Sequence, residues 1–161
     1  MANTPQTGQV PPDFTLPGIE LAGDEVSHSQ YTLSQQRGTP IVLAFYPGDN
    51  TPVCTRQLCS YTSGLESFTG FGALVWAISP QDLASHEKFA RTYDLAFPLL
   101  ADEGLTVARE YGITLGGAGL RRSVFVIDSG GVLRWKHVTL VGLTFPTAKT
   151  IAAQLASLKA A

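Results

Sequence analysis

Residues that bind metals or act as nucleophiles are scarce in this sequence. Two cysteines and three histidines occur among 161 residues. His28, His86 and His137 are scattered, and no C-x-x-C or H-x-x-x-H spacing is present, so the ligands of a zinc site are missing. Histidines this few are expected to lie on the surface. The two thiols, Cys54 and Cys59, remain as the candidates for chemistry.

The chain also lacks a block of like charge and a long apolar run. Eleven basic and 13 acidic residues give a formal charge of -2, so neither nucleic acid nor an anionic membrane is expected as a partner. No stretch approaches the length that spans a bilayer. The first residues, MANTPQTGQVPPDF, do not have the pattern of a signal peptide. We therefore expect a cytoplasmic protein, in which a structural disulfide is disfavoured and a pair of working thiols fits better.

What is present indicates an ordinary globular domain. The chain is 44% hydrophobic, and its length suits one domain covering 1–161, with 1–12 as a loosely packed N-terminal segment. Apolar, β-rich runs predict buried strands at 41–46, 73–79 and 123–128. The turn sequence DSGG then leads into an alternating strand at 132–138, which predicts an antiparallel hairpin.

Helical patterns lie between and after these strands. One begins near Thr51, and a second covers 79–93 with its first residue as the N-cap and a proline in the first helical position. A short helix covers 105–112, and the last spans about 146–159 with apolar side chains on one face. Strands that alternate with helices and end in a hairpin predict an α/β fold, with a mixed sheet flanked by helices on both faces and an N-terminal extension.

The first of these helices carries the thiols. Thr51 is a favoured N-cap and Pro52 a favoured first residue, which places Cys54 in the third helical position. There the backbone N–H groups and the positive end of the helix dipole stabilise a thiolate, and such placement lowers a thiol pKa from about 8.5 to below about 7.5. The alternative is that Cys54 is a small buried apolar residue without chemistry.

Cys59 stands too far along the same helix to bond with Cys54. Five helical residues separate the two Cα atoms by about 8.6 Å, whereas a disulfide needs them within about 7 Å. The next residues, SYTSG at 60–64, are weak helix formers that together cost roughly 3 kcal/mol relative to alanine. Either the helix ends at Gly64, or this half of it opens at modest cost.

The spacing P-x-x-x-T-x-x-C, made by Pro47, Thr51 and Cys54, resembles the active-site motif of the peroxiredoxins. With Cys59 five residues further on, FYPGDNTPVCTRQLC is similar to the bacterioferritin-comigratory, or Q-type, subgroup. The resemblance extends over most of the chain and includes PDFTLP, ISPQ, FPLLAD and RRSVFVIDSGGVL.

This resemblance implies a thioredoxin-like fold and an enzyme that reduces hydrogen peroxide and organic hydroperoxides. Cys54 would be the peroxidatic thiolate, Thr51 would direct its hydroxyl to the peroxide, and Pro47 would shield the sulfur from water. Cys59 would resolve the sulfenic acid into an intramolecular disulfide after the helix unwinds. A thioredoxin-like dithiol would then reduce that disulfide. No cofactor or metal is implied, because sulfur itself changes oxidation state.

The family also uses an arginine on a later strand to hold the thiolate. In RRSVFVID the spacing assigns this role to Arg122, and since neighbouring strand residues face opposite ways, Arg121 cannot point at Cys54 as well. Val53 and Leu58 are bulkier than the Gly and Ala usual in the subgroup, which bears on how readily the helix opens. We expect a monomer. A thiol–disulfide oxidoreductase and a non-enzymatic redox sensor remain as alternatives.

Overall fold

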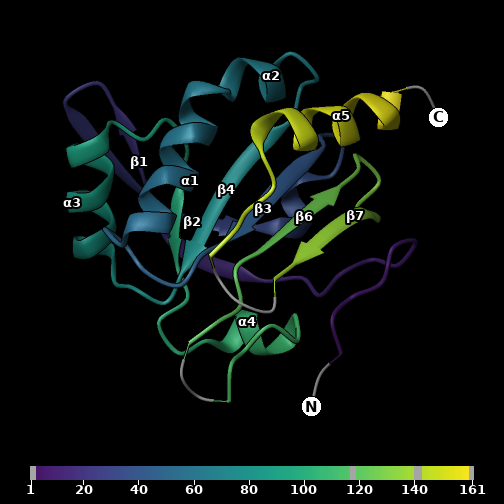
Figure 1. Ribbon diagram of the computed structural model, residues 1–161, viewed down its shortest axis with the longest axis horizontal. Coiled ribbons are helices and arrows are strands. Elements are labelled where there is room, and N and C mark those ends of the chain that lie inside the picture. Colours follow the sequence, from purple (N-terminus) through teal and green to yellow (C-terminus); the bar gives the residue numbers. More distant parts are fainter. Residues whose placement is uncertain (1–2, 117–118, 140–142, 160–161) are drawn as a thin grey trace.

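A mixed β-sheet lies at the centre of the computed structural model, which describes residues 3–116, 119–139 and 143–159. Within these residues the sheet has seven strands in the order β2-β1-β5-β4-β3-β6-β7 (Figure 1). The strands are β1 Thr15–Ala22, β2 Glu25–Thr32, β3 Ile41–Phe45, β4 Leu74–Ser79, β5 Leu99–Ala101, β6 Ser123–Ile127 and β7 Leu133–Val138. The helices are η1 Leu33–Gln36, α1 Pro52–Ser63, α2 Leu65–Thr69, α3 Leu83–Tyr93, α4 Thr106–Glu110 and α5 Ala148–Lys159.

The centre of the sheet matches the prediction. The strands expected at 41–46, 73–79 and 123–128 are confirmed as β3, β4 and β6, with ends that differ by one residue at most. β3 is parallel to β4 and antiparallel to β6, and the predicted hairpin is confirmed by the antiparallel pairing of β6 with β7. The sheet is therefore mixed, as expected.

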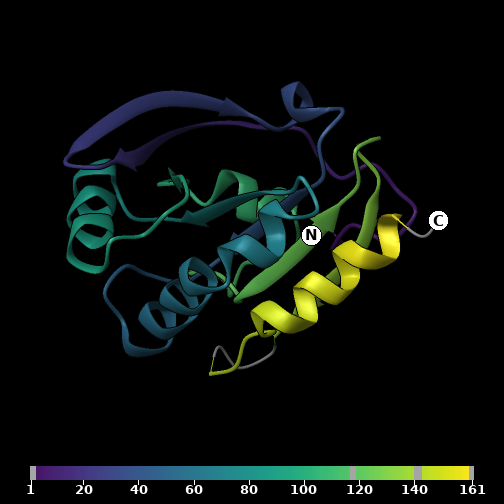
Figure 2. The same ribbon diagram turned by 90° about the horizontal axis from the view of Figure 1, so that it is seen from above.

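Each face of the sheet has its own hydrophobic core, because successive strand residues point to opposite sides. Side chains from α1, α2, α3 and α5 fill one core, and side chains from α4 and the N-terminal region fill the other. In β3 and the residue after it, the helix-rich core takes Val42, Ala44 and Tyr46, and the other core takes Ile41, Leu43 and Phe45. Figure 2 shows α1, α2 and α5 together on one side of the strands.

The second long helix begins later than predicted. Its N-cap is Asp82, whose carboxylate accepts a hydrogen bond from the backbone N–H of Ser85 at 2.8 Å, and the helix runs from Leu83 to Tyr93. Ser79 is instead the buried last residue of β4. A start at Ser79 is therefore wrong, since the strand continues through that residue.

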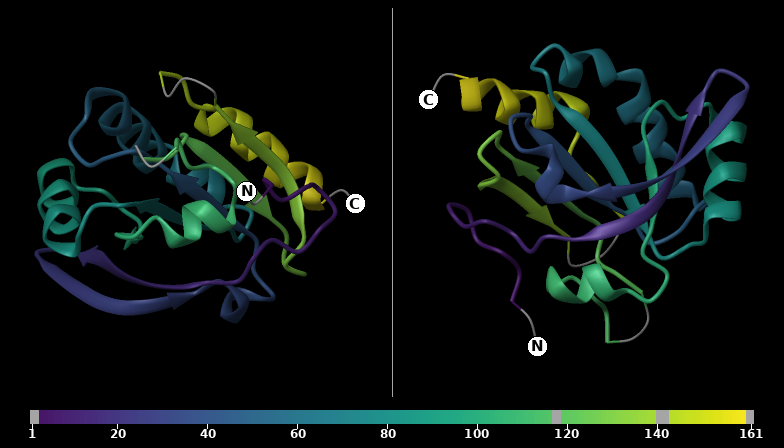
Figure 3. Two further views of the ribbon diagram at one scale, coloured as in Figure 1. Left: turned by 90° about the horizontal axis from the view of Figure 1, so that it is seen from below. Right: turned by 180° about the vertical axis from the view of Figure 1, so that it is seen from behind.

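The N-terminal segment predicted as loosely packed is tethered to the fold. The N–H of Gly8 donates to the carbonyl of Leu133 at 2.8 Å, and the N–H of Leu133 donates to Gln9 at the same distance. Figure 3 shows the segment passing beside β7. The single domain expected for 1–161 stays a prediction. In the part of the chain that is described, no helix combines the length and the apolar character needed to cross a bilayer.

Candidate active site

Cys54 lies at the start of α1, directly after the loop that leaves β3. Thr51 is the N-cap residue with extended backbone angles, Pro52 is the first helical residue, and the N–H of Thr55 donates to the carbonyl of Thr51 at 2.8 Å. The Thr51 hydroxyl makes no capping bond and instead donates to the carbonyl of Gly48 at 3.0 Å. Cys54 thus takes the third helical position that the sequence predicts, while the Thr51 side chain fastens the loop.

A guanidinium contacts the sulfur of Cys54. Nη2 of Arg122 donates to Sγ of Cys54 at 3.2 Å, and the two residues are 2% and 0% exposed. Arginine keeps its charge at every physiological pH, and a charge-assisted hydrogen bond in a low-dielectric interior is strong. Together with the N-terminal end of α1, this contact places positive charge on two sides of the Cys54 sulfur.

Arg122 itself is held from two sides. Its carbonyl accepts hydrogen bonds from the N–H and the hydroxyl of Thr139 at 3.0 and 2.8 Å. Its Nη1 donates to Oε1 of Gln57, one helical turn after Cys54, at 2.5 Å. Because both ends of the residue are fixed, the guanidinium reaches the sulfur without an entropic search among rotamers.

Arg121 does not share this place. Its backbone N–H donates to the carbonyl of Ile113 at 2.6 Å, and its buried Nε has no hydrogen-bond partner among the residues described. The strand alternation that argued for Arg122 is the reason: Val124 and Val126 lie in the helix-rich core with Cys54, and Arg122 has the same parity.

Sequence reasoning missed a buried relay beyond Arg122. Nε2 of Gln57 donates to the Tyr61 hydroxyl at 3.3 Å, and that hydroxyl donates to the carbonyl of Pro146 at 2.6 Å. Burial raises the pKa of Tyr61, which keeps the hydroxyl protonated as this donor. The relay connects Arg122 to two successive turns of α1, through Gln57 and Tyr61, and to the segment before α5. A glutamine three residues after the first cysteine is its only sequence signal.

Cys59 is a free, half-buried thiol in the middle of the same helix. Burial raises the pKa of its thiol, so Cys59 is protonated at neutral pH. The helix is continuous through Ser63 and has Gly64 as its C-cap, so the residues of SYTSG before the glycine are helical. A disulfide to Cys54 therefore requires α1 to open.

Opening costs more than helix propensity alone predicts. Leu58 and Tyr61 lie on the inner face of α1 and are both 0% exposed. Each large side chain that leaves the core costs roughly 1.5–3 kcal/mol, and the bonds of Tyr61 add to that. These two residues hold the weak second half of α1 in place.

One of the three histidines is buried, against expectation. His86, in α3, is 0% exposed, with Nδ1 2.7 Å from Oδ2 of Asp49 and Nε2 2.9 Å from the carbonyl oxygen of Leu100. The Tyr46 hydroxyl donates to Oδ1 of the same Asp49 at 2.6 Å. Burial raises the pKa of Tyr46, as do Asp49 and a negative charge at Cys54, so this cluster interacts electrostatically with the thiol.

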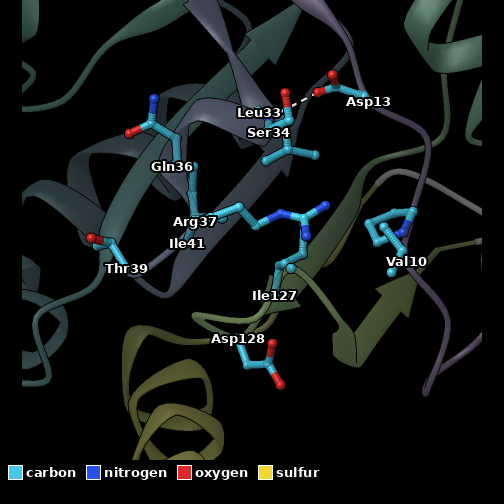
Figure 4. A pocket seen from close by; sticks show the side chains of 12 residues that line it. Val10, Asp13, Leu33, Ser34, Gln36, Arg37, Thr39, Ile41, Ile127 and Asp128 are labelled. Atoms are coloured by element: carbon cyan, nitrogen blue, oxygen red, sulfur yellow. Dashed lines mark hydrogen bonds between the residues drawn. The ribbon is translucent and has the colours of Figure 1, made fainter.

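A separate cavity of about 120 Å³ lies at the other end of β3 from Cys54. Figure 4 shows Arg37 extending across it, and Asp13 accepting from the N–H of Ser34 at 2.8 Å. The guanidinium of Arg37 donates to the carbonyl of Gly130 at 3.1 Å. These polar groups bond to the cavity walls, and neither thiol lines the cavity.

Comparison with known proteins places this geometry in context. Residues 7–136 match the model of the AhpC/TSA family. Over 130 residues the chain is 43% identical to the chloroplastic peroxiredoxin Q of Triticum aestivum, covering 80% of this chain and 57% of that protein. It is 41% identical over 129 residues to the chloroplastic peroxiredoxin Q of Arabidopsis thaliana, covering 79% of this chain and 56% of that protein. The chain thus spans little more than half the length of these relatives.

Solved structures share the fold. The reduced 2-Cys peroxiredoxin of Plasmodium vivax superimposes with a TM-score of 0.86 at 20% identity, covering 96% of each chain. AhpC of Mycobacterium bovis gives a TM-score of 0.85 at 17% identity, covering 97% of this chain and 93% of that one. These likenesses confirm the predicted thioredoxin-like α/β fold.

Proposed function

Because the chain belongs to the AhpC/TSA family and resembles the Q-type peroxiredoxins, we propose that it is a thiol-dependent peroxidase acting on hydrogen peroxide and organic hydroperoxides. The observation that carries the proposal is the 3.2 Å contact between Arg122 and the sulfur of Cys54 at the first turn of α1. A nucleophilic sulfur needs stabilised negative charge, and this site supplies a buried cation and a helix N-terminus.

In the first step the Cys54 thiolate attacks the outer oxygen of the peroxide. A sulfur–oxygen bond forms, the oxygen–oxygen bond breaks, and the alkoxide or hydroxide that leaves takes up a proton. Cys54 becomes a sulfenic acid. Negative charge moves from sulfur to the leaving oxygen, so the fixed donors of Arg122 favour the transition state. Thr51 would direct its hydroxyl toward the peroxide, and Pro47 would shield the sulfur from water.

In the second step α1 opens and the thiol of Cys59 attacks the sulfenic sulfur. A disulfide forms and one water leaves. A dithiol reductant of the thioredoxin type then exchanges with this disulfide, which returns both thiols and oxidises the reductant. The separation of the two cysteines within an intact helix supports an opening step rather than direct bonding.

A turnover assay tests the proposal. Protein, thioredoxin, its reductase and a nicotinamide donor are mixed with peroxide, and peroxide consumed per protein is measured. We expect many turnovers. Consumption of one equivalent would indicate a redox sensor, and reduction of disulfide substrates without peroxide consumption would indicate a thiol–disulfide oxidoreductase. We further propose a cytoplasmic monomer, for which size-exclusion chromatography with light scattering is the check on assembly.

Cys59→Ser is expected to consume one equivalent of peroxide and stop. The first step does not use Cys59, so the variant should form the Cys54 sulfenic acid at the wild-type rate, within about twofold. Mass spectrometry after trapping with a dicarbonyl probe should show that species. An added small thiol should restore turnover by acting as an external resolving group. Disulfide formation within the variant, or full turnover with thioredoxin, would contradict the role of Cys59.

Leu58→Ala is expected to speed disulfide formation while lowering stability. The substitution removes about 2–5 kcal/mol of core packing from the folded state, and most of this loss applies to the closed helix alone. The opening free energy falls, so the second step should accelerate at least about tenfold. Stopped-flow fluorescence after rapid peroxide addition measures it. Leu155→Ala, in the same core but on α5, should destabilise the fold similarly without accelerating the step; equal acceleration by both would refute the mechanism.

A further inference from the structure

Both ring nitrogens of His86 face hydrogen-bond acceptors. Nδ1 lies 2.7 Å from a carboxylate oxygen of Asp49, and Nε2 lies 2.9 Å from the carbonyl oxygen of Leu100. A neutral imidazole has one N–H and one lone pair, so it satisfies only one of these partners. An imidazolium donates to both. Burial at 0% exposure makes an unmatched lone pair costly.

Two further side chains donate to Asp49. Its Oδ1 accepts from the Tyr46 hydroxyl at 2.6 Å, and its Oδ2 accepts from the Ser85 hydroxyl at 2.7 Å. The side chains of His86 and Asp49 are 0% and 3% exposed, so these hydrogen bonds form away from water, where each is costly to lose. Tyr46 is a titratable side chain that contacts both residues of the pair. A charge at Cys54 interacts electrostatically with Tyr46.

This pair braces the loop that precedes Cys54. Asp49 stands between Pro47 and Thr51, whereas Ser85 and His86 belong to α3 and Leu100 belongs to β5. The loop is thereby fastened to two elements other than α1. The Tyr46 hydroxyl also lies 3.4 Å from Nδ1 of His86, which closes the cluster.

We propose that His86 is a positioning residue for peroxide reduction: with Nδ1 against Asp49 and Nε2 against the carbonyl of Leu100, it holds the 46–51 loop so that Pro47 and Thr51 face Cys54. This inference rests on the proposed function. Loss of the brace lets the loop shift, and a displacement of about 1 Å costs on the order of 100-fold in a step that depends on alignment.

The hydrogen bonding of the ring is tested on the wild-type protein. In ¹⁵N-labelled protein, long-range ¹H–¹⁵N spectra detect the ring N–H groups of the histidines. His86 should show a ring N–H that exchanges slowly with solvent, because the ring is 0% exposed and both nitrogens face acceptors. His28→Gln and His137→Gln assign the other two rings by difference. Rapid solvent exchange of every ring N–H of His86 would overturn the proposal.

The positioning role is tested by kinetics. His86→Gln donates to one acceptor only, and we expect its rate of Cys54 oxidation by hydrogen peroxide to fall 10- to 100-fold. His28→Gln, the same change at an exposed histidine, should stay within about twofold. Adding Asp49→Asn should cost less in the His86→Gln background than in the wild type, because the two residues act as a unit. A rate within twofold of wild type for His86→Gln would refute the role.

A folding failure of His86→Gln does not end the test. Tyr46→Phe keeps the buried ring and removes only the hydroxyl that donates to Asp49, and it should slow oxidation at least fivefold. An unchanged rate in that variant would also refute the role. If the wild type itself fails to react with peroxide, the proposed function fails, while the spectra still decide whether the His86 ring is held by its hydrogen bonds.

Discussion

Replacement of Cys54 by serine is expected to abolish peroxide consumption. A serine hydroxyl is a far weaker acid and nucleophile than a thiol, and its oxygen does not pass to a stable oxidised state. Loss of the nucleophile should lower the turnover rate by at least about 10⁴-fold. The measurement is peroxide consumption with thioredoxin, reductase and a nicotinamide donor present, together with mass spectrometry of the protein after peroxide exposure.

The comparison that gives this result meaning is Cys59→Ser. Both variants lose one thiol and gain one hydroxyl, and Cys54→Ser fills nearly the same buried space, so circular dichroism and thermal unfolding should stay close to wild type. Cys59→Ser should still react once with peroxide, whereas Cys54→Ser should remain unmodified. Activity of Cys54→Ser equal to wild type would contradict the assignment of the peroxidatic thiol.

The sequence predicted well those elements whose own residue types favour one kind of secondary structure. β3, β4 and β6 are short runs rich in branched and aromatic apolar residues, the composition of strands buried on both faces. Thr51 and Pro52 mark the start of α1, because a proline at the first helical position loses no hydrogen bond. Gly112, with a φ of 66°, follows α4 in the left-handed conformation that glycine adopts without strain.

The elements that sequence missed depend on partners far along the chain. β2 is mostly exposed and polar, with only Val26 and Tyr31 packed against the two cores, and becomes a strand through pairing with β1. β5 is three residues long and is defined by β1 and β4 on its two sides. Asp82 replaces Ser79 as the cap of α3 because the β4 ladder extends through Ser79, which pairs with Ala101.

The site shows the same difference between residues identified from local sequence and residues that depend on distant contacts. The motif named Pro47, Thr51, Cys54 and Cys59 from one stretch of sequence. The resemblance of RRSVFVID to the family named Arg122, which the structure brings to the sulfur. Their catalytic roles stay predictions. The polar side chains that hold the site gave little signal, because each acts through tertiary contacts: Gln57 bonds a residue 65 positions away, and Asp49 one that is 37 away.

Replacement of Arg122 has the second-largest expected effect. Arg122→Met keeps the length and the apolar stem but removes the charge and both donors, so the sulfur loses its buried cation and the leaving oxygen loses its stabilisation. Removal of one such donor costs about 10²–10³-fold in related sites. We expect a loss of that size in the second-order rate of Cys54 oxidation, measured by stopped flow under excess peroxide.

The rate of Cys54 oxidation in Arg122→Lys should lie between the rates of the wild type and Arg122→Met. Lysine keeps the charge, but it cannot donate to Cys54 and Gln57 with the fixed fork of a guanidinium, so a partial loss of about tenfold is expected. Arg121→Met is the matched control, since it removes the neighbouring cation, whose backbone bonds to Ile113 and which makes no contact with the sulfur among the described residues. It should react within about threefold of wild type. Equal losses in Arg121→Met and Arg122→Met would mean that general positive charge near the strand, and not a donor fixed on Cys54, drives the reaction.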